Sequence, residues 1–447
     1  MYYQKDFPPE EFQQRRQAIM DRIGAQAIAV IGGAGSTGAF DYFRQTNEFY
    51  YLTGVEVPHA YLRIDGATRR STLYLPHHDP KHERSEGGQL HCDLPEAVSA
   101  LIGMEAIAPL AQLASDVQRS SIIFAPQAPG EGRQACRDTL RNQRKLMEAD
   151  PWDQRPSREA HLQARLAAVA TRATFADLCP LLDDLRLIKS ERELDLLRRA
   201  GQVTAQAVCQ AMRHTRAGLF EFQLAALADG VFSDAGARSA GYRAIVASGA
   251  NIWNAHYYRN NCLLQAGDLV LMDYAPDLGC YTSDIGRMWP VNGCYSAVQR
   301  ELYGFVVAYH EVLIQIIRPG VTVAELAREA ADCIRPLWTS WDFSKSCYRE
   351  AARNMFESTV AFTHPVGMAV HDVGEYRHEP LREGVVFALD PQLWVAEESL
   401  YVRVEDTLAI TKFGNEVFTD AAPRRLDEVE AEMKTGIPDR QTALRHI

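Results

Sequence analysis

The order of apolar and polar residues in the first half of the chain predicts a mixture of helices and short strands. Residues 10–23 carry apolar side chains at helical spacing, whereas the apolar runs 27–31 and 71–75 are typical of strands. Residues 42–54 are rich in aromatic side chains, and we expect them to be strand-like. Residues 141–163 are charged and lack apolar periodicity, which indicates a surface helix or an interdomain segment.

A clear helix start opens the second half of the chain. Ser190 and Glu193 have the spacing of a capping box, and leucines follow at helical positions. Beyond this helix, helical patterns alternate with strands, of which residues 269–274, 385–389 and 401–411 are the clearest. The pattern predicts an α+β domain with mostly antiparallel pairing. We place a domain boundary near residue 180.

Charge and cysteine usage exclude several classes of protein. Acidic residues exceed basic ones by 58 − 47 = 11, which argues against nucleic acid as a partner. The N-terminus has no basic stretch followed by an apolar run, and no apolar stretch has membrane-spanning length, so we expect no signal peptide and no membrane partner. The nine cysteines are scattered without a CxxC pair. They predict a reduced, cytoplasmic chain and argue against a cysteine-ligated structural zinc.

The most informative segment runs from Leu269 to Gly293 and reads LVLMDYAPDLGCYTSDIGRMWPVNG. It predicts two strands joined by a turn, and a turn centred between Leu278 and Gly279 would place Asp273 directly opposite Asp284. Facing carboxylates destabilise a hairpin unless a cation neutralises them, and divalent cations favour such oxygens. Two aspartates in solvated turns are the alternative interpretation, and this segment alone leaves both open.

Three further segments carry candidate chemistry. Arg403 and Glu405 share one face of an alternating strand, His364 and His371 lie seven residues apart, and Asp390 ends an apolar strand. Taken singly, each has an ordinary interpretation: a surface salt bridge, two unrelated histidines and a turn aspartate.

Together these segments resemble the pita-bread metallopeptidase family, and within it aminopeptidase P. The family pattern of metal ligands maps onto Asp273, Asp284, His364, Asp390 and Glu405. The resemblance implies that Asp284 and Glu405 bridge two metals, that Asp273 binds one metal, and that His364 and Asp390 bind the other.

The resemblance also implies substrate-contacting residues and a second domain. His371 matches the second family histidine, and His256 matches the histidine that follows an ASG turn. Residues 43–62 resemble the amino-terminal domain of aminopeptidase P, which simpler methionine aminopeptidases lack. We therefore expect a pita-bread catalytic domain over residues 181–447, preceded by a smaller α/β domain over residues 1–180 that helps to form a homo-dimer or homo-tetramer.

The sequence departs from the family pattern at three positions. Asp390 stands where glutamate is usual, Gly286 replaces a threonine, and Val360 occupies the place of a histidine four residues before His364. The five ligand positions remain chemically competent, so these departures bear on substrate and rate.

Two other motifs resemble binding sites, but we interpret both as loops. The run Gly33 to Gly38 matches the GxGxxG dinucleotide pattern, but no helical pattern follows it, and we expect a loop. His77, His78 and His82 form a histidine cluster that we expect to lie in a solvated loop.

The predicted function is metal-assisted hydrolysis of a peptide with proline in second place, cleaved after its first residue. Two divalent ions, manganese in our prediction and cobalt or zinc as alternatives, would activate a water. Asp390 would accept a proton, His256 and His371 would contact substrate, and Arg403 would orient Glu405 or meet the substrate. The alternatives are an Xaa-Pro dipeptidase or metabolite amide hydrolase of the same fold, or a non-catalytic peptide-binding module. Retention of all five ligand positions argues against the last.

Overall fold

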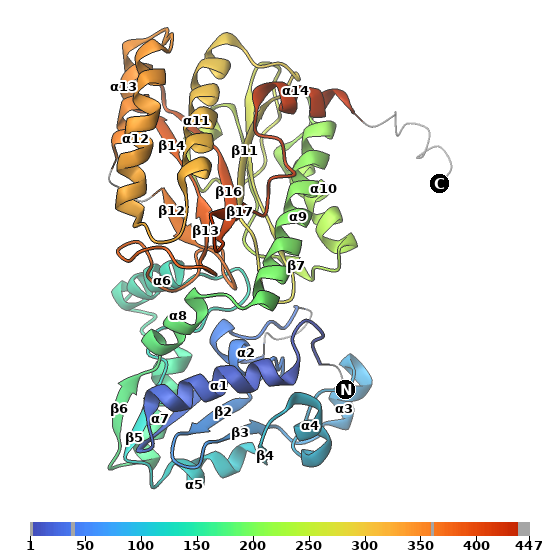
Figure 1. The fold of residues 1–447 in the computed structure, drawn as a ribbon. Helices are drawn as coiled ribbons and strands as arrows, with labels where there is room; N and C mark the ends of the chain where they lie inside the picture. The colour runs from blue at the N-terminus through green and yellow to red at the C-terminus, as the bar shows by residue number, and fades with distance from the viewer. Residues whose placement is uncertain (1–2, 37–40, 359–361, 437–447) are drawn as a thin grey trace. The chain divides into compact units, whose positions relative to one another are not determined.

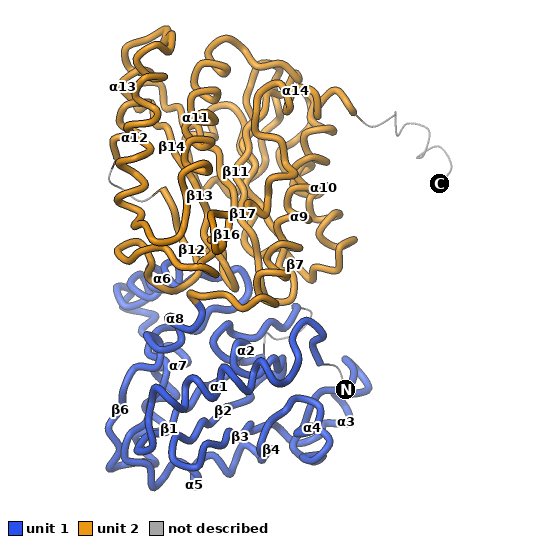
Figure 2. The backbone as a smooth tube through the Cα atoms, viewed as in Figure 1, with its two compact units in different colours: residues 1–186 blue, residues 187–447 orange. Residues whose placement is uncertain are grey.

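The computed structural model describes residues 3–36, 41–358 and 362–436. Its backbone divides into two compact units, residues 1–186 and residues 187–447, which Figure 2 shows in different colours. Each unit has its own sheet. The glycine run that ends at Gly38 lies partly outside the described residues, and Val360 lies outside them.

The N-terminal unit is built on a mixed six-stranded sheet with the order β4-β3-β2-β1-β5-β6. The pairs β1–β2 and β2–β3 are antiparallel, and the other three pairs are parallel. Its strands are β1 Ala27–Gly32, β2 Tyr61–Asp65, β3 Arg70–Leu75, β4 Ala106–Pro109, β5 Ile122–Ala125 and β6 Thr174–Asp177.

The helices of this unit, labelled in Figure 1, are α1 Pro9–Ile23, α2 Asn47–Thr53, α3 Pro80–Glu86, α4 Pro95–Ile102, α5 Leu113–Val117, α6 Arg137–Ala149, α7 Arg158–Val169 and α8 Cys179–Leu187. Apolar residues of β1 and β5 (Ile28, Val30 and Ile123) pack with residues of α5 and α7 (Val117 and Leu166) to form a core. The sheet and its helices give the α/β fold expected for this part of the chain.

The strand-like interpretation of residues 42–54 was wrong, because this segment contains helix α2. All seven residues of α2 are buried, and Gly54 ends the helix in the left-handed region with φ 64°. A helix that is buried on every side shows no amphipathic period, so its aromatic residues could be mistaken for a strand. The segment 141–163 contains parts of two helices, α6 and α7, rather than one.

A buried group of four charged side chains holds the N-terminal unit together. Arg186 Nη1 lies 2.7 Å from Glu131 Oε2, and Arg137 Nη2 lies 3.2 Å from Glu48 Oε1. All four side chains are buried. Burial and then the neighbouring Glu131 raise the pKa of Glu48 to about 7. The charges of the Arg186–Glu131 pair therefore affect the Arg137–Glu48 pair.

Removing one arginine from this group should be costly. We expect Arg186→Met to lower the free energy of unfolding of this unit by about 3–5 kcal/mol, since it leaves a buried carboxylate without its partner. Urea denaturation of the full chain measures the shift. Arg22→Met is the matched control, because Arg22 forms a solvent-exposed ion pair with Asp184 and should matter little. Equal stability of both variants would contradict the prediction.

The C-terminal unit contains a seven-stranded sheet with the order β12-β13-β16-β11-β9-β8, and β17 also pairs with β16. All pairs in this sheet are antiparallel. Its strands are β8 Ile245–Ser248, β9 Leu269–Asp273, β11 Ile285–Pro290, β12 Thr363–Pro365, β13 Val386–Leu389, β16 Glu405–Ile410 and β17 Asn415–Val417. Two small ribbons accompany it: β7 Ser239–Ala240 with β10 Pro276–Asp277, and β14 Gln392–Val395 with β15 Leu400–Arg403.

The α-helices of this unit within residues 187–358 and 362–436 are α9 Glu191–His214, α10 Glu221–Asp234, α11 Ala297–Ile316, α12 Val323–Ser340, α13 Ser346–Glu357 and α14 Leu426–Lys434. Helices α9 and α10 pack on each other, and α11, α12 and α13 form a second group (Figure 1). Ser190 and Glu193 form the predicted capping box at the start of α9. The α+β fold with antiparallel pairing is confirmed.

One predicted strand of the C-terminal unit is two strands. Residues 401–411 divide at Val404 into the end of β15 and the whole of β16, because β15 pairs with β14 whereas β16 pairs with β13 and β11. Among the described residues, no helix is long and apolar enough to span a membrane.

Candidate metal centre

Five polar residues come together inside the large sheet, where β9 and β11 meet β12, β13 and β16. His364 lies in β12, Asp390 follows β13, Glu405 begins β16, Asp284 precedes β11, and Asp273 ends β9. These five strands are neighbours in the sheet in this same order. Strands β11 and β16 pair only through their first residues, so β9 and β11 extend from this point in one direction and β12, β13 and β16 in the other. One end of each strand therefore lies at this junction, which is why residues more than 130 positions apart in the sequence meet.

The predicted register of the β9–β11 hairpin was wrong. Met272 pairs with Arg287 and Leu278 pairs with Tyr281, so Gly286, not Asp284, lies opposite Asp273. The turn consists of Gly279 and Cys280, whose φ angles of 61° and 69° are the positive values that a tight hairpin turn requires. The two aspartates are therefore diagonal neighbours on one face.

Three of the five side chains form a compact group. His364 Nε2 lies 3.3 Å from Asp284 Oδ2 and 3.3 Å from Glu405 Oε1. Their ligand atoms all lie within 4.8 Å of one another. Ligand atoms at about 2.1 Å from a shared tetrahedral cation are separated by roughly 3.4 Å, so this group has the spacing of a metal site.

The other two carboxylates contact the guanidinium of Arg403. Arg403 Nη2 donates a short hydrogen bond to Asp273 and lies 2.8 Å from Glu405 Oε2, and Arg403 Nη1 lies 3.5 Å from Asp390 Oδ2. The arginine therefore links the two ends of the carboxylate cluster.

The charge of this pocket favours a bound cation. Asp273, Asp284, Asp390, Glu405 and Arg403 are each at most 6 % exposed. With His364 neutral, four carboxylates against one guanidinium leave 4 − 1 = 3 negative charges, and buried charge without a partner is expensive. Among the described residues, Oδ1 of Asp273 and Oδ1 of Asp390 find no hydrogen-bond partner. Oxygen and imidazole donors with free lone pairs fit divalent metal ions.

The pKa values of the pocket show the same need for positive charge. Burial alone would lower the pKa of His364, but hydrogen bonds from its ring to Asp284 and Glu405 raise it well above its usual value. Burial and then the charge of Glu405 raise the pKa of Asp390 to about 7. Protons on these groups occupy the role that a metal ion would fill.

Several supporting residues escaped sequence analysis. The hydroxyl of Tyr242 donates to Asp284 Oδ1 at 2.8 Å, and Thr407 Oγ1 accepts from the Asp284 backbone N–H at 2.7 Å. Arg287 Nη1 donates to the Glu405 backbone oxygen at 2.5 Å. Thr407 lies two residues after Glu405, so strand alternation was a usable signal for it. Tyr242 belongs to no motif, and no sequence signal pointed to it.

Two further predicted residues lie beside the carboxylates. The ring of His371 is centred 4.3 Å from that of His364, and the ring of His256 is centred 6.4 Å from that of His371. The three imidazoles form a row that starts at the metal centre. His256 is solvent-exposed, whereas His371 is partly buried.

The glycine at position 286 makes room for Arg403. A Cβ atom on Gly286 would lie 2.9 Å from Arg403 Nε and 2.9 Å from Glu405 Cβ. The departure from threonine at this position thus accompanies the close approach of the guanidinium to Glu405. Asp390 is held by Gln392, which donates a short hydrogen bond to Asp390 Oδ2.

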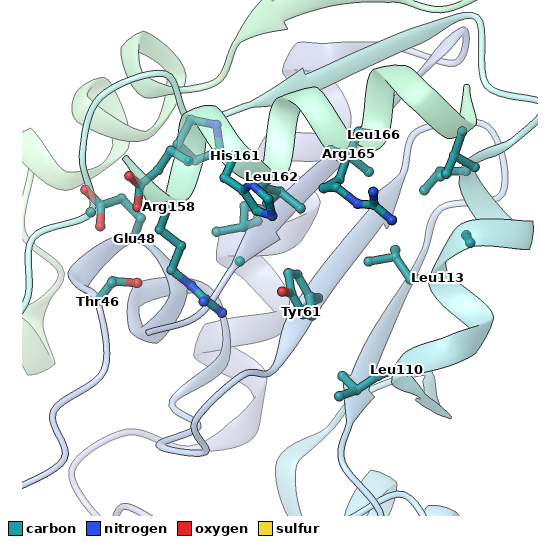
Figure 3. Close-up of a pocket in the computed structure, with 18 residues that line it drawn as sticks. Thr46, Glu48, Tyr61, Leu110, Leu113, Arg158, His161, Leu162, Arg165 and Leu166 are labelled. Atoms are coloured by element: carbon teal, nitrogen blue, oxygen red, sulfur yellow. The ribbon is translucent and has the colours of Figure 1, made fainter. Parts of the chain in front are cut away.

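A separate cavity of about 350 Å³ lies within the N-terminal unit (Figure 3). Tyr61, Arg158, His161 and Arg165 line it together with apolar residues. Neither group of possible metal ligands found in the described part of the chain belongs to this cavity. It is therefore not a second candidate for metal-assisted hydrolysis.

An antiparallel sheet packed against helices, with carboxylates and a histidine gathered at the junction of its two halves, is typical of a metal-dependent hydrolase of the pita-bread fold. Residues 195–412 match the family described as metallopeptidase family M24, and residues 12–121 match the aminopeptidase P N-terminal domain. A relative from Escherichia coli (strain K12), named Xaa-Pro aminopeptidase, is 31% identical over 95% of this chain and 97% of its own length.

Solved structures agree with this result. Aminopeptidase P from E. coli with the inhibitor Pro-Leu has a TM-score of 0.79 at 28% identity, covering 96% of this chain and 99% of that one. Zinc-substituted E. coli aminopeptidase P in complex with product has a TM-score of 0.77 at 28% identity, covering 97% and 100%. The chain belongs to metallopeptidase family M24, in its aminopeptidase P-like branch with the additional N-terminal domain.

Proposed function

We propose that this chain is a two-metal aminopeptidase that releases the first residue of a peptide whose second residue is proline. The buried cluster with its three excess negative charges carries the metal part of the proposal. The substrate part is supported by the relative named Xaa-Pro aminopeptidase, which the chain matches over nearly its whole length.

The five candidate ligands divide between two metal positions. Asp284 and Glu405 would bridge the metals, Asp273 would bind one, and His364 and Asp390 would bind the other. Oxygen and imidazole donors suit manganese, which we propose as the physiological metal, with cobalt and zinc as substitutes. When bound, the metals supply a water that is ionised near neutral pH and polarise the carbonyl of the substrate.

Side chains of this chain would position the substrate and move the proton. Asp390 Oδ1, which lacks a hydrogen-bond partner among the described residues, would accept the proton of the attacking water. His371 and His256, in the row of imidazoles, would contact the substrate and its developing oxyanion. Arg403 would hold Glu405 and Asp273 in place.

Three further predictions stay part of the proposal. The two compact units would be independent domains with a boundary near residue 180, the protein would form a homo-dimer or homo-tetramer, and it would act in the cytoplasm. The scattered cysteines all lie in the described part of the chain and form no disulfide there, which is compatible with a reducing compartment.

Substrate preference tests the proposal. We expect a tripeptide with proline in second place to be cleaved at least about tenfold faster than its alanine counterpart, because a site shaped for proline accepts a tertiary amide with fixed φ and no N–H. Mass spectrometry of the products measures both rates. An Xaa-Pro dipeptide separates the aminopeptidase from a dipeptidase. Equal cleavage of the alanine peptide, or cleavage of the dipeptide alone, would overturn the substrate assignment.

A further inference from the structure

A second group of metal-ligating side chains lies in the N-terminal unit, where the chain enters helices α3 and α4 (Figure 1). The loop after β3 contains His77, and the segment before α4 contains Cys92 and Asp93. The backbone N–H of Cys92 donates to the oxygen of Pro76 at 3.1 Å, and that of His78 donates to Asp93 Oδ2 at 2.7 Å. Two backbone-anchored contacts thus hold these segments side by side.

The side-chain atoms of the group converge. Cys92 Sγ lies 3.4 Å from His77 Nδ1, and Asp93 Oδ1 lies 2.6 Å from the same nitrogen. The three ligand atoms lie within 4.8 Å of one another. His91 Nδ1 lies 3.5 Å from Asp93 Oδ2 and, although buried, finds no hydrogen-bond partner among the described residues. His91 is not one of the three residues whose ligand atoms converge, so its ring would have to turn toward a bound ion to act as the fourth donor.

The distances agree with a tetrahedral zinc site. A sulfur at about 2.3 Å and a nitrogen at about 2.05 Å from a tetrahedral zinc ion are separated by roughly 3.6 Å, close to the separation of Cys92 Sγ and His77 Nδ1. The shorter contact between His77 and Asp93 is a hydrogen bond. Because the Asp93 side chain is 41 % exposed, it has room to turn when a cation replaces the shared proton.

We propose that His77, His91, Cys92 and Asp93, here named the thiolate cluster, bind one divalent cation of the zinc type. A thiolate with imidazole ligands favours zinc over manganese, magnesium or calcium. Four protein ligands leave no open position for a substrate, so the ion would clamp the starts of α3 and α4. The scattered cysteines argued against a structural zinc site held by cysteines. The thiolate cluster differs from such a site because only one of its ligands is a cysteine.

Cobalt titration of the metal-depleted full chain tests the proposal. Cobalt bound to a thiolate gives a sulfur-to-metal charge-transfer band in the near ultraviolet, and the candidate catalytic ligands include no cysteine. Because the two-metal centre also takes up cobalt, we expect Co²⁺ added until the chain is saturated to produce this band with the intensity of one thiolate-bound ion per chain, and Zn²⁺ to remove it. Asp284→Asn, which alters the other metal centre, should keep the band.

Matched variants decide the result. Cys92→Ser should lose the band, whereas Cys333→Ser, at an exposed cysteine of α12, should keep it. His77→Ala should weaken cobalt binding by more than about tenfold, since even outer partners of metal ligands have effects of that size. The His77 side chain is 71 % exposed, so this variant decides the question if Cys92→Ser fails to fold. Absence of the band in the wild type, or unchanged binding in His77→Ala, would overturn the proposal.

Discussion

Replacing Asp284 by asparagine should reduce kcat/KM for a proline-second tripeptide by more than about 10³-fold. Substitution of a residue that merely supports a metal ligand lowers metal affinity or activity about 10–100-fold, and substitution of a bridging ligand should lower activity further. A loss of 10³ corresponds to about 4 kcal/mol of transition-state stabilisation. The structure adds a physical reason: Asp284 accepts from Tyr242 and lies 3.3 Å from His364, so it is held beside another candidate ligand.

Asp277→Asn is the matched control for this prediction. Asp277 belongs to the same hairpin and is also buried, but its carboxylate accepts a hydrogen bond from the Cys280 backbone N–H within the turn. We expect its activity to stay within about threefold of the wild type, with both metals bound. The comparison is made by steady-state kinetics together with metal analysis of each purified variant. Similar losses in the two variants would indicate a folding effect and remove support for a bridging role of Asp284.

Substitution of Asp390 should also have a large effect. We expect Asp390→Asn to lose at least about 10²-fold in kcat, because the amide can neither accept the proton nor neutralise a metal. Asp390→Glu should also lower activity, although it restores the residue usual in the family. Its carboxylate would extend about 1.5 Å further, and the space is filled by Arg403 and Gln392, which already contact Asp390 Oδ2.

Activity and metal content of both Asp390 variants distinguish the outcomes. A variant that binds both metals but turns over slowly would make Asp390 the proton acceptor. A variant that loses one metal would make it chiefly a ligand. If Asp390→Asn kept near-normal activity and both metals, Asp390 would be neither, and the assignment of the fourth ligand would be wrong.

The sequence was sufficient to place the long, periodic elements and the polar residues at strand ends. Strands β9 and β13 and the capping box of α9 follow from local patterns. The resemblance to the family supplied the five candidate metal ligands that the sheet brings together. These features depend on short-range periodicity. The candidate residues Asp273, Asp390 and Glu405 each end or begin a strand, which is a local property that a sequence displays.

Features that depend on long-range contacts could not be predicted in the same way. The predicted centre of the turn was one residue too early, which shifted the predicted partner of Asp273 by two residues, because Gly279 and Cys280 form the turn. The buried helix α2 has no polar face to mark it. Tyr242 approaches Asp284 only because the β7–β8 region lies against the hairpin, and no residue near Tyr242 in the sequence signals that contact.

Metal dependence of proline-second cleavage is the most direct test of the two-metal centre. The chain is depleted of metal by prolonged chelation, its metal content is measured, and Mn²⁺ is added in steps while release of the first residue of a proline-second tripeptide is followed. We expect the depleted chain to retain less than about 1% of the activity, a loss of roughly 10²-fold or more, and activity to rise until two Mn²⁺ per chain are bound. Full turnover by a chain shown to be free of metal would contradict the two-metal centre.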